Sequence, residues 1–364
     1  AILSPAALSI VTTTFTEGAE RNKALGVWGA VAGSGGAAGV LLGGVLTDAL
    51  SWEWVLFVNV PIGLAAAAVA PYLLADTRDT DRHRSFDAAG AVTITAGLSI
   101  LVYALVDAED AGWGSTQTIV LLAVAALLHL AFVAIESRAQ SPLVPFAILR
   151  NRTLTASNAV GLLIGMALFS MFFFVSLYMQ NVLGFDALET GLAYLPLALT
   201  IIVSAGVASQ LSTRFGFKPV LMGGLLLVAG GLVWFSQVSV GGSYTADVLF
   251  PSLLAGAGLG FAFVPVTIGA VTGTREEESG LASGLINTSQ QIGGALGLAV
   301  LATVAFSGLP EGAPDLGALT AGFRDAFLVG ATFALAAFLI AALAIRTRDS
   351  EAMKGAEAPA PAAA

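Results

Sequence analysis

Long apolar segments constrain the fold of this chain more than any other feature of its sequence. Hydropathy divides the chain into eleven such segments, at roughly 1–15, 24–48, 53–75, 87–107, 117–135, 153–180, 190–211, 219–237, 247–272, 283–306 and 323–345. All but the first reach about the ~20 residues that a helix needs to cross the ~30 Å hydrocarbon core of a bilayer. We therefore expect an all-α polytopic membrane protein whose first segment is a partial helix.

Composition excludes several other classes of protein. A chain with 57% hydrophobic and 11% charged residues has too much apolar surface for a soluble fold. With no cysteine and two histidines, the sequence predicts no disulfide, no metal site and no cofactor. It also lacks a Ser/His/Asp set and paired carboxylates within the apolar segments, so we predict no enzymatic activity. No basic surface suggests a nucleic-acid partner.

The basic residues give an independent check on the number of segments. Cytoplasmic loops of membrane proteins are enriched in Lys and Arg. Taking alternate loops as one side collects fourteen of the 15 basic residues and leaves only Arg324 opposite. Those fourteen are Arg21, Lys23, Arg78, Arg82, Arg84, Arg138, Arg150, Arg152, Arg214, Lys218, Arg275, Arg346, Arg348 and Lys354. One wrong segment in the middle would destroy this separation, and the pattern predicts a cytoplasmic C-terminus in the plasma membrane.

Segment 24–48 is unusually rich in glycine. Gly35, Gly39 and Gly43 repeat at four-residue intervals, and Gly44 follows directly. In lipid this spacing lets two helices approach backbone to backbone. The pattern fits either a static packing surface or a surface along which helices slide.

Two motifs here resemble the major facilitator superfamily, in its fourteen-helix drug:proton antiporter branch. The pattern G-x3-G-x3-GG resembles the family's fifth-helix antiporter motif, and WEWVLFVNVPIG at 52–63 resembles the entry to its sixth helix. In the second motif the matching positions are Trp52, Trp54, Asn59, Pro61 and Gly63. The chain departs from the family pattern at Val40, where Pro is usual, and at Glu53, where Arg is usual.

The resemblance also implies a register and a division into domains. The first segment would correspond to the family's fourth helix, so that about eleven of an expected fourteen helices are present. Residues 1–75 would then complete an N-terminal bundle, and 76–140 would form two inserted linker helices. Residues 141–346 would form a six-helix C-terminal bundle, with 347–364 as a disordered cytoplasmic tail.

Two segments carry candidate residues for a substrate path. Segment 153–180 is rich in aromatic and Met side chains, which suit bulky apolar ligands. Segment 283–306 holds the most polar run of any apolar segment, and some of its side chains must face protein or a water-filled cavity. The candidates are Asn158, Phe169, Phe173, Tyr178, Asn287, Gln290 and Gln291. Helix packing remains an equal alternative for each of them.

Two further short motifs resemble known functional motifs. Arg214, Gly216 and Lys218 resemble the second-half copy of the family's cytoplasmic loop motif, which implies a structural gate latch without chemistry. The run GAGLG at 256–260 superficially resembles a dinucleotide-binding loop. Because it lies within an apolar segment and follows no strand, we expect another helix-packing surface instead.

The resemblance implies a secondary transporter that exports small apolar or amphipathic compounds, with the lipid bilayer, a small-molecule substrate and protons as partners. No Asp, Glu, Lys or Arg lies in the middle of any segment, so the sequence offers no evident proton-coupling group. A uniporter or an exporter without proton coupling therefore remains an alternative. A truncated membrane protein that does not transport is a third, because the chain begins within an expected helix.

Overall fold

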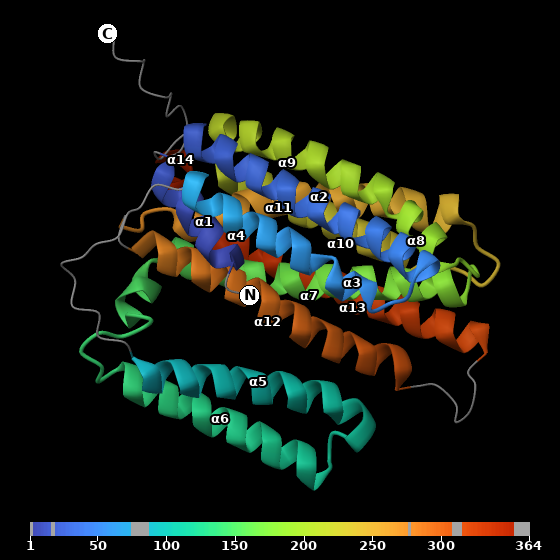
Figure 1. Ribbon diagram of the computed structural model, residues 1–364, viewed down its shortest axis with the longest axis horizontal. Coiled ribbons are helices and arrows are strands. Elements are labelled where there is room, and N and C mark those ends of the chain that lie inside the picture. Colours follow the sequence, from blue (N-terminus) through green and yellow to red (C-terminus); the bar gives the residue numbers. More distant parts are fainter. Residues whose placement is uncertain (1–2, 16–18, 74–86, 276–277, 308–314, 353–364) are drawn as a thin grey trace.

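The computed structural model describes residues 3–15, 19–73, 87–275, 278–307 and 315–352, and these residues are almost entirely helical (Figure 1). In chain order the helices are α1 (Leu3–Thr14), α2 (Ala19–Ala49), α3 (Trp54–Phe57), α4 (Asn59–Leu73), α5 (Ala88–Ala111), α6 (Thr116–Glu136), the 3₁₀ helix η1 (Phe146–Arg150), α7 (Arg152–Asn181), α8 (Ala187–Ala193), α9 (Leu195–Phe215), α10 (Phe217–Phe235), the π-helix η2 (Tyr244–Leu249), α11 (Phe250–Val271), α12 (Ser279–Phe306), α13 (Leu316–Ala344) and α14 (Thr347–Ala352).

Every predicted apolar segment coincides with one helix or with two consecutive helices, which confirms the all-α fold. Within the described residues, nine spans are long and apolar enough to cross a membrane, compared with the eleven predicted segments. The remaining two segments are α1, which has 12 residues, and α2, which has 31. At 1.5 Å per residue α2 is ~46 Å long, which exceeds the thickness of the hydrocarbon core.

Three predicted segments are interrupted helices. Segment 53–75 is divided between α3 and α4, 190–211 between α8 and α9, and 247–272 between η2 and α11. The sequence also placed some boundaries too late: α13 begins at Leu316, because the side chain of Asp315 accepts a hydrogen bond from the Ala318 N–H and caps the helix.

The helices pack side by side along the long axis of the molecule (Figure 1). At the centre α11 contacts α7, α9 and α10, while α13 contacts α7, α10 and α12. The first two helices contact different members of this group. Helix α1 packs on α12, whereas α2 packs on α8 and α9. This arrangement brings the first helices of the chain against α11 and α12.

An aromatic cluster fills one end of the central group. The ring of Phe174 on α7 lies 6.1 Å from that of Phe306 on α12 and 5.9 Å from that of Phe323 on α13. Phe327 stacks on Phe235 of α10 at 5.1 Å. Four helices therefore share one apolar core, which fixes α12 relative to α7.

Two parts of the chain lie outside this core. The α5–α6 hairpin stands apart in Figure 1 and reaches the other helices through contacts of α5 with α12. Helices α3 and α4 contain no buried residue. Side chains of both parts are predominantly apolar, as expected for surfaces that face lipid or other apolar helices.

The end of the chain differs from the predicted disordered tail. Thr347–Ala352 forms α14, and the side chain of Ser350 is buried against the start of α10, where its Oγ accepts a hydrogen bond from the Lys218 N–H at 2.9 Å. Asp349 accepts a second hydrogen bond from Thr153. Charged composition suggested disorder, but these side chains bond to the ends of neighbouring helices. The rest of the predicted tail, 353–364, lies outside the described residues.

Candidate functional site

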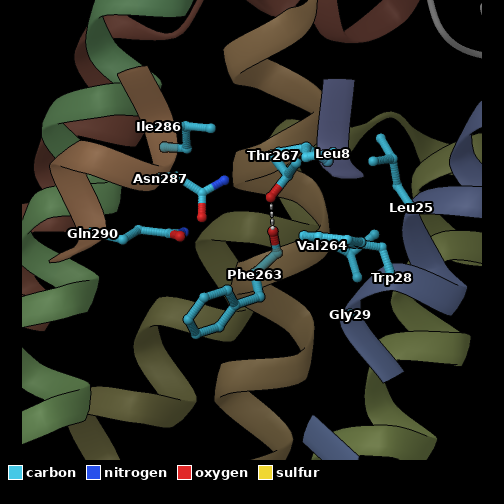
Figure 2. Close-up of a pocket in the computed structure, with 10 residues that line it drawn as sticks. All are labelled: Leu8, Leu25, Trp28, Gly29, Phe263, Val264, Thr267, Ile286, Asn287 and Gln290. Atoms are coloured by element: carbon cyan, nitrogen blue, oxygen red, sulfur yellow. Dashed lines mark hydrogen bonds between the residues drawn. The ribbon is translucent and has the colours of Figure 1, made fainter. Parts of the chain in front are cut away.

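A small cavity lies where α1 and α2 meet α11 and α12, and its volume is about 100 Å³ (Figure 2). The residues that line it come from all four helices and none is charged; they are Leu8, Leu25, Trp28, Gly29, Phe263, Val264, Thr267, Ile286, Asn287 and Gln290. The cavity thus lies between the first two helices of the chain and the helices of its second half.

Helix α12 supplies the polar wall of the cavity. Asn287 and Gln290 are three residues apart, so their side chains project from the same face of the helix. The Nδ2 of Asn287 donates to the Ser283 carbonyl one turn earlier, at 3.2 Å. The Nε2 of Gln290 is buried and has no hydrogen-bond partner among the described residues. An unpaired buried amide costs about 1–3 kcal/mol, so this N–H is ready to bind an acceptor in a ligand.

Helices α11 and α2 supply the apolar wall. Thr267 does not offer its hydroxyl proton to the cavity, because Oγ1 donates to the Phe263 carbonyl at 2.8 Å (Figure 2). Gly29 brings α2 close to α11, since a Cβ there would lie 2.9 Å from a methyl group of Val264. Trp28, the neighbour of Gly29, also lines the cavity.

Close contact between α7 and α12 fixes the polar wall. A Cβ at Gly165 would lie 2.2 Å from the Gln290 carbonyl oxygen, and one at Gly293 would lie 2.0 Å from the Leu162 carbonyl oxygen. A Cβ at Gly297 would lie 2.4 Å from the Cα of Met166. Because backbone meets backbone at each point, α12 cannot rotate or approach further without moving α7 as well.

The arrangement suits reversible binding of an uncharged or weakly polar molecule. It offers aromatic and aliphatic surface together with one unpaired amide donor, the combination typical of small-molecule sites. No acid or base lines the cavity. In the described part of the chain, no group of three or more His, Cys, Asp or Glu residues is placed to hold a metal ion.

The structure places the other predicted substrate-path residues differently. Asn158 on α7 accepts a hydrogen bond from Ser289 Oγ at 3.1 Å and so joins α7 to α12 beside the cavity. Gln291, Phe169 and Phe173 are exposed and do not line the cavity. Tyr178 is buried, but its hydroxyl donates to the Ser239 carbonyl at 2.7 Å, in the turn that precedes η2. Asn287 and Gln290 are therefore the only two of the seven that line the cavity.

The glycines of α2 divide into two groups. Gly44 is buried, and a Cβ there would lie 2.7 Å from the Ala187 carbonyl oxygen at the start of α8. A Cβ at Gly35 or Gly39 would meet no described atom within 4 Å, and one at Gly43 would meet only Val55, at 4.0 Å. The packing surface of α2 within the described residues therefore runs through Gly26, Gly29 and Gly44.

The motif at 52–63 lies on the exposed side of the molecule. Trp52 is 65% exposed and Trp54 is 48% exposed. The side chain of Asn59 donates to the Val55 and Leu56 carbonyls and bridges the break between α3 and α4. Pro61 and Gly63 are exposed on α4, and a Cβ at Gly63 would meet no described atom within 4 Å.

The predicted gate loop connects α9 and α10 to the end of α13. Gly216 has a φ of +86°, and a Cβ there would lie 2.5 Å from Ser350 Oγ. The ammonium group of Lys218 donates to the Ala342 and Ile345 carbonyls at 2.8 Å and 2.7 Å. A cation at this position also stabilises the negative end of the α13 dipole. The guanidinium of Arg214 lies over the ring of Phe215.

Sequence reasoning missed most of the apolar wall. Trp28 is the one aromatic residue in segment 24–48, and a large ring in a glycine-rich helix was a signal that could have identified it. The four-residue spacings of Gly161 with Gly165 and of Gly293 with Gly297 were likewise visible. Leu8 and Leu25 carried no such signal, because apolar residues surround them on both sides.

The sequence of this chain matches one family model and several known proteins. The family model "Major Facilitator Superfamily" matches residues 1–298. The cephamycin export protein CmcT of Amycolatopsis lactamdurans is 39% identical over 92% of this chain and 69% of its own length. The puromycin resistance protein pur8 of Streptomyces alboniger is 37% identical over 92% of this chain and 67% of its own. The multidrug transporter protein MdtP of Bacillus subtilis is 30% identical over 83% and 56%.

Among solved structures, the human organic anion transporter MFSD10 matches with a TM-score of 0.44 and 15% identity, over 93% of this chain and 83% of that one. This likeness is too weak to bear on function. The chain spans between 56% and 69% of the length of the three relatives named above. The match of the family model across most of the chain and the identity to these relatives show that the chain belongs to the major facilitator superfamily of membrane transporters.

Proposed function

We propose that this protein is a secondary transporter that exports small apolar or amphipathic compounds across the plasma membrane. The observation that carries the proposal is the cavity between α1–α2 and α11–α12, with apolar walls and the unpaired Gln290 amide. The printed names of the relatives, which include a cephamycin export protein and a multidrug transporter, support the class of compound.

The size of the cavity supports a mechanism of alternating access. A volume of about 100 Å³ is smaller than the ~300–1,000 Å³ of pockets that enclose drug-sized ligands. The conformation described here can thus hold only part of such a ligand. In the proposed cycle, α1 and α2 rock against α11 and α12, which widens the cavity first on one side of the membrane and then on the other.

The same proposal includes the division of the chain into helix groups and its orientation. Residues 1–75 would belong to one moving bundle and 141–346 to the other, with 76–140 as inserted linker helices. Arg152 and Lys218 lie near the C-terminal end of α13. Arg152 donates a hydrogen bond to the Leu343 carbonyl, and Lys218 donates to the Ala342 and Ile345 carbonyls. Basic residues gathered at one end favour a cytoplasmic position for that end and for the C-terminus.

Proton antiport is the form of coupling that we propose, on the basis of the family resemblance. A titratable group must then lie outside the cavity lining described here, because none of the ten lining residues is acidic or basic. An exporter without proton coupling is the second candidate, favoured by this same uncharged lining.

Expression in a bacterial host that lacks its own major efflux pumps tests the proposal. We expect cells that make the protein to accumulate less ethidium and to tolerate more puromycin than cells with the empty vector. Replacing Gln290 by Leu should change the relative protection against the two compounds, since it removes the polar donor. Gln291→Leu, one residue away but on the exposed face, is the matched control and should leave both unchanged.

Equal accumulation in cells with and without the protein, at confirmed membrane expression, would contradict export. An altered profile in Gln291→Leu together with an unaltered one in Gln290→Leu would contradict the position of the site. If export continues in the presence of a protonophore, it does not depend on a proton gradient. That result would contradict proton antiport and favour the exporter without proton coupling.

A further inference from the structure

Two carboxyl groups meet at the base of the α5–α6 hairpin, far along the chain from any residue of the cavity. Asp87 caps the start of α5, where its Oδ1 accepts a hydrogen bond from the Gly90 N–H at 2.7 Å. Glu136 ends α6, and its Oε1 accepts a hydrogen bond from the Val144 N–H in the segment that leads to η1. Each carboxyl group thus uses one oxygen to bind backbone.

The second oxygen of each group has no hydrogen-bond partner among the described residues. Asp87 Oδ2 and Glu136 Oε2 are both buried without a hydrogen bond, and the Glu136 side chain is only 3% exposed. They face the same small space above Gly90, because a Cβ there would lie 2.5 Å from Asp87 Oδ2 and 2.9 Å from Glu136 Oε2. The missing side chain of Gly90 leaves room for the two oxygens to meet.

No described cation neutralises this pair. Arg138 and Arg150, the basic residues on either side of the Val144 segment, are exposed and form no ion pair with it. Helix α12, which packs on α5, contains no titratable residue. On the hairpin itself, His129 bonds to the Ala125 carbonyl within α6, and Asp107 bonds to Gln117 at the opposite end.

Two ionised carboxylates cannot face each other in a buried space without a cation, because their repulsion is not screened by water. One proton removes one charge and supplies the hydrogen bond that both free oxygens lack. We propose that Asp87 and Glu136 bind a single proton between Oδ2 and Oε2, at neutral pH, as a proton site distinct from the cavity.

The shared proton would hold three parts of the chain together. Asp87 fixes the start of α5, Glu136 fixes the end of α6, and the Val144 N–H ties in the segment before η1 and α7. Loss of the proton restores the repulsion and weakens this junction between the hairpin and the second half of the chain. The junction is therefore sensitive to pH at the end of the molecule where α7 begins.

Infrared spectroscopy of the purified protein in lipid tests the site directly, because a protonated carboxyl group has a C=O band separate from that of a carboxylate. We expect the wild type to show this band at neutral pH and Glu136→Gln to lack it. Asp87→Asn should lack it too, since Glu136 then has no anionic neighbour with which to share the proton. Asp107→Asn, on the same helix but hydrogen-bonded to Gln117, is the matched control and should retain the band.

A band that persists in Asp87→Asn would show that Glu136 holds a proton alone, and would overturn the shared site. Absence of the band in the wild type would overturn it as well. If Glu136→Gln does not fold, the spectrum of Asp87→Asn alone tests whether the two carboxyl groups share a proton.

Thermal unfolding at several pH values gives a second, independent readout. If the folded pair binds a proton that the unfolded chain releases, stability is complete at low pH and is lost as the pH rises. Because an unfolded carboxyl group releases its proton near pH 4, we expect a steeper loss of stability as the pH rises above about 4 for the wild type than for Glu136→Gln. Equal slopes would contradict the proposal. A wild-type stability that depends on Na⁺ or Mg²⁺ at fixed pH would instead assign the two oxygens to a metal cation.

Discussion

Replacing Gly293 by Ala should destabilise the protein by separating α12 from α7. The added Cβ would lie 2.0 Å from the Leu162 carbonyl oxygen, 2.8 Å from its carbonyl carbon and 3.0 Å from its Cα. An ordinary van der Waals contact is 3.4–4 Å, more than 1 Å longer than the first of these distances, and backbone atoms cannot rotate away as a side chain can. Overpacking of this kind costs about 1–3 kcal/mol.

Gly284 is the matched control, because it lies in the same helix and a Cβ there would meet no described atom within 4 Å. Gly284→Ala should be neutral or stabilise the helix by up to about 1 kcal/mol. The two variants should therefore differ by roughly 1–4 kcal/mol in the free energy of unfolding, measured in mixed micelles of mild and denaturing detergent. Equal stabilities would refute the backbone-to-backbone contact.

The same two variants also test whether the contact between α7 and α12 is needed for export through the cavity. Asn287 lies between positions 284 and 293 on α12, so a shift of the helix axis at Gly293 moves the polar wall. We expect Gly293→Ala to reduce ethidium export at expression levels where Gly284→Ala exports normally. Normal export by a correctly inserted Gly293→Ala variant would show that export does not depend on the close contact between α7 and α12.

Three further predictions follow from single contacts. Gly44→Ala should lower the unfolding temperature because its Cβ meets the Ala187 carbonyl, whereas Gly39→Ala should not, since no described atom lies within 4 Å. Lys218→Met should lower stability by about 1–3 kcal/mol in detergent unfolding, because its ammonium group binds two carbonyls at the end of α13; an unchanged value would argue against the latch. Tyr178→Phe should cost about 1 kcal/mol in the same assay by removing the bond to Ser239, while Tyr103→Phe, which is exposed, should cost nothing.

Hydropathy predicted the helices well because the bilayer sets their length. All eleven segments fall on helices, from α1 to α13. Breaks within segments were not predictable in the same way: α8 ends at Ala193 and α9 begins at Leu195 within one continuous apolar run. Lipid requires that backbone groups be bonded, but it does not dictate where a neighbouring helix allows a break.

The candidate site was only partly predictable. The polar run of α12 pointed to Asn287 and Gln290, because polar side chains in a span must avoid lipid. The same rule could not distinguish Gln290 from Gln291, which is exposed, since that depends on the rotation of α12 against α7. The wall formed by Leu8 and Trp28 required the tertiary structure, because only packing brings α1 and α2 to α11 and α12.

Inverted membrane vesicles that contain the protein test export most directly. With the vesicle interior made acidic, we measure uptake of labelled puromycin with and without a protonophore. The account predicts uptake above that of vesicles from cells without the protein, lost when the pH gradient is removed and reduced by Gln290→Leu. No uptake above these control vesicles, with the protein present and correctly inserted, would contradict it.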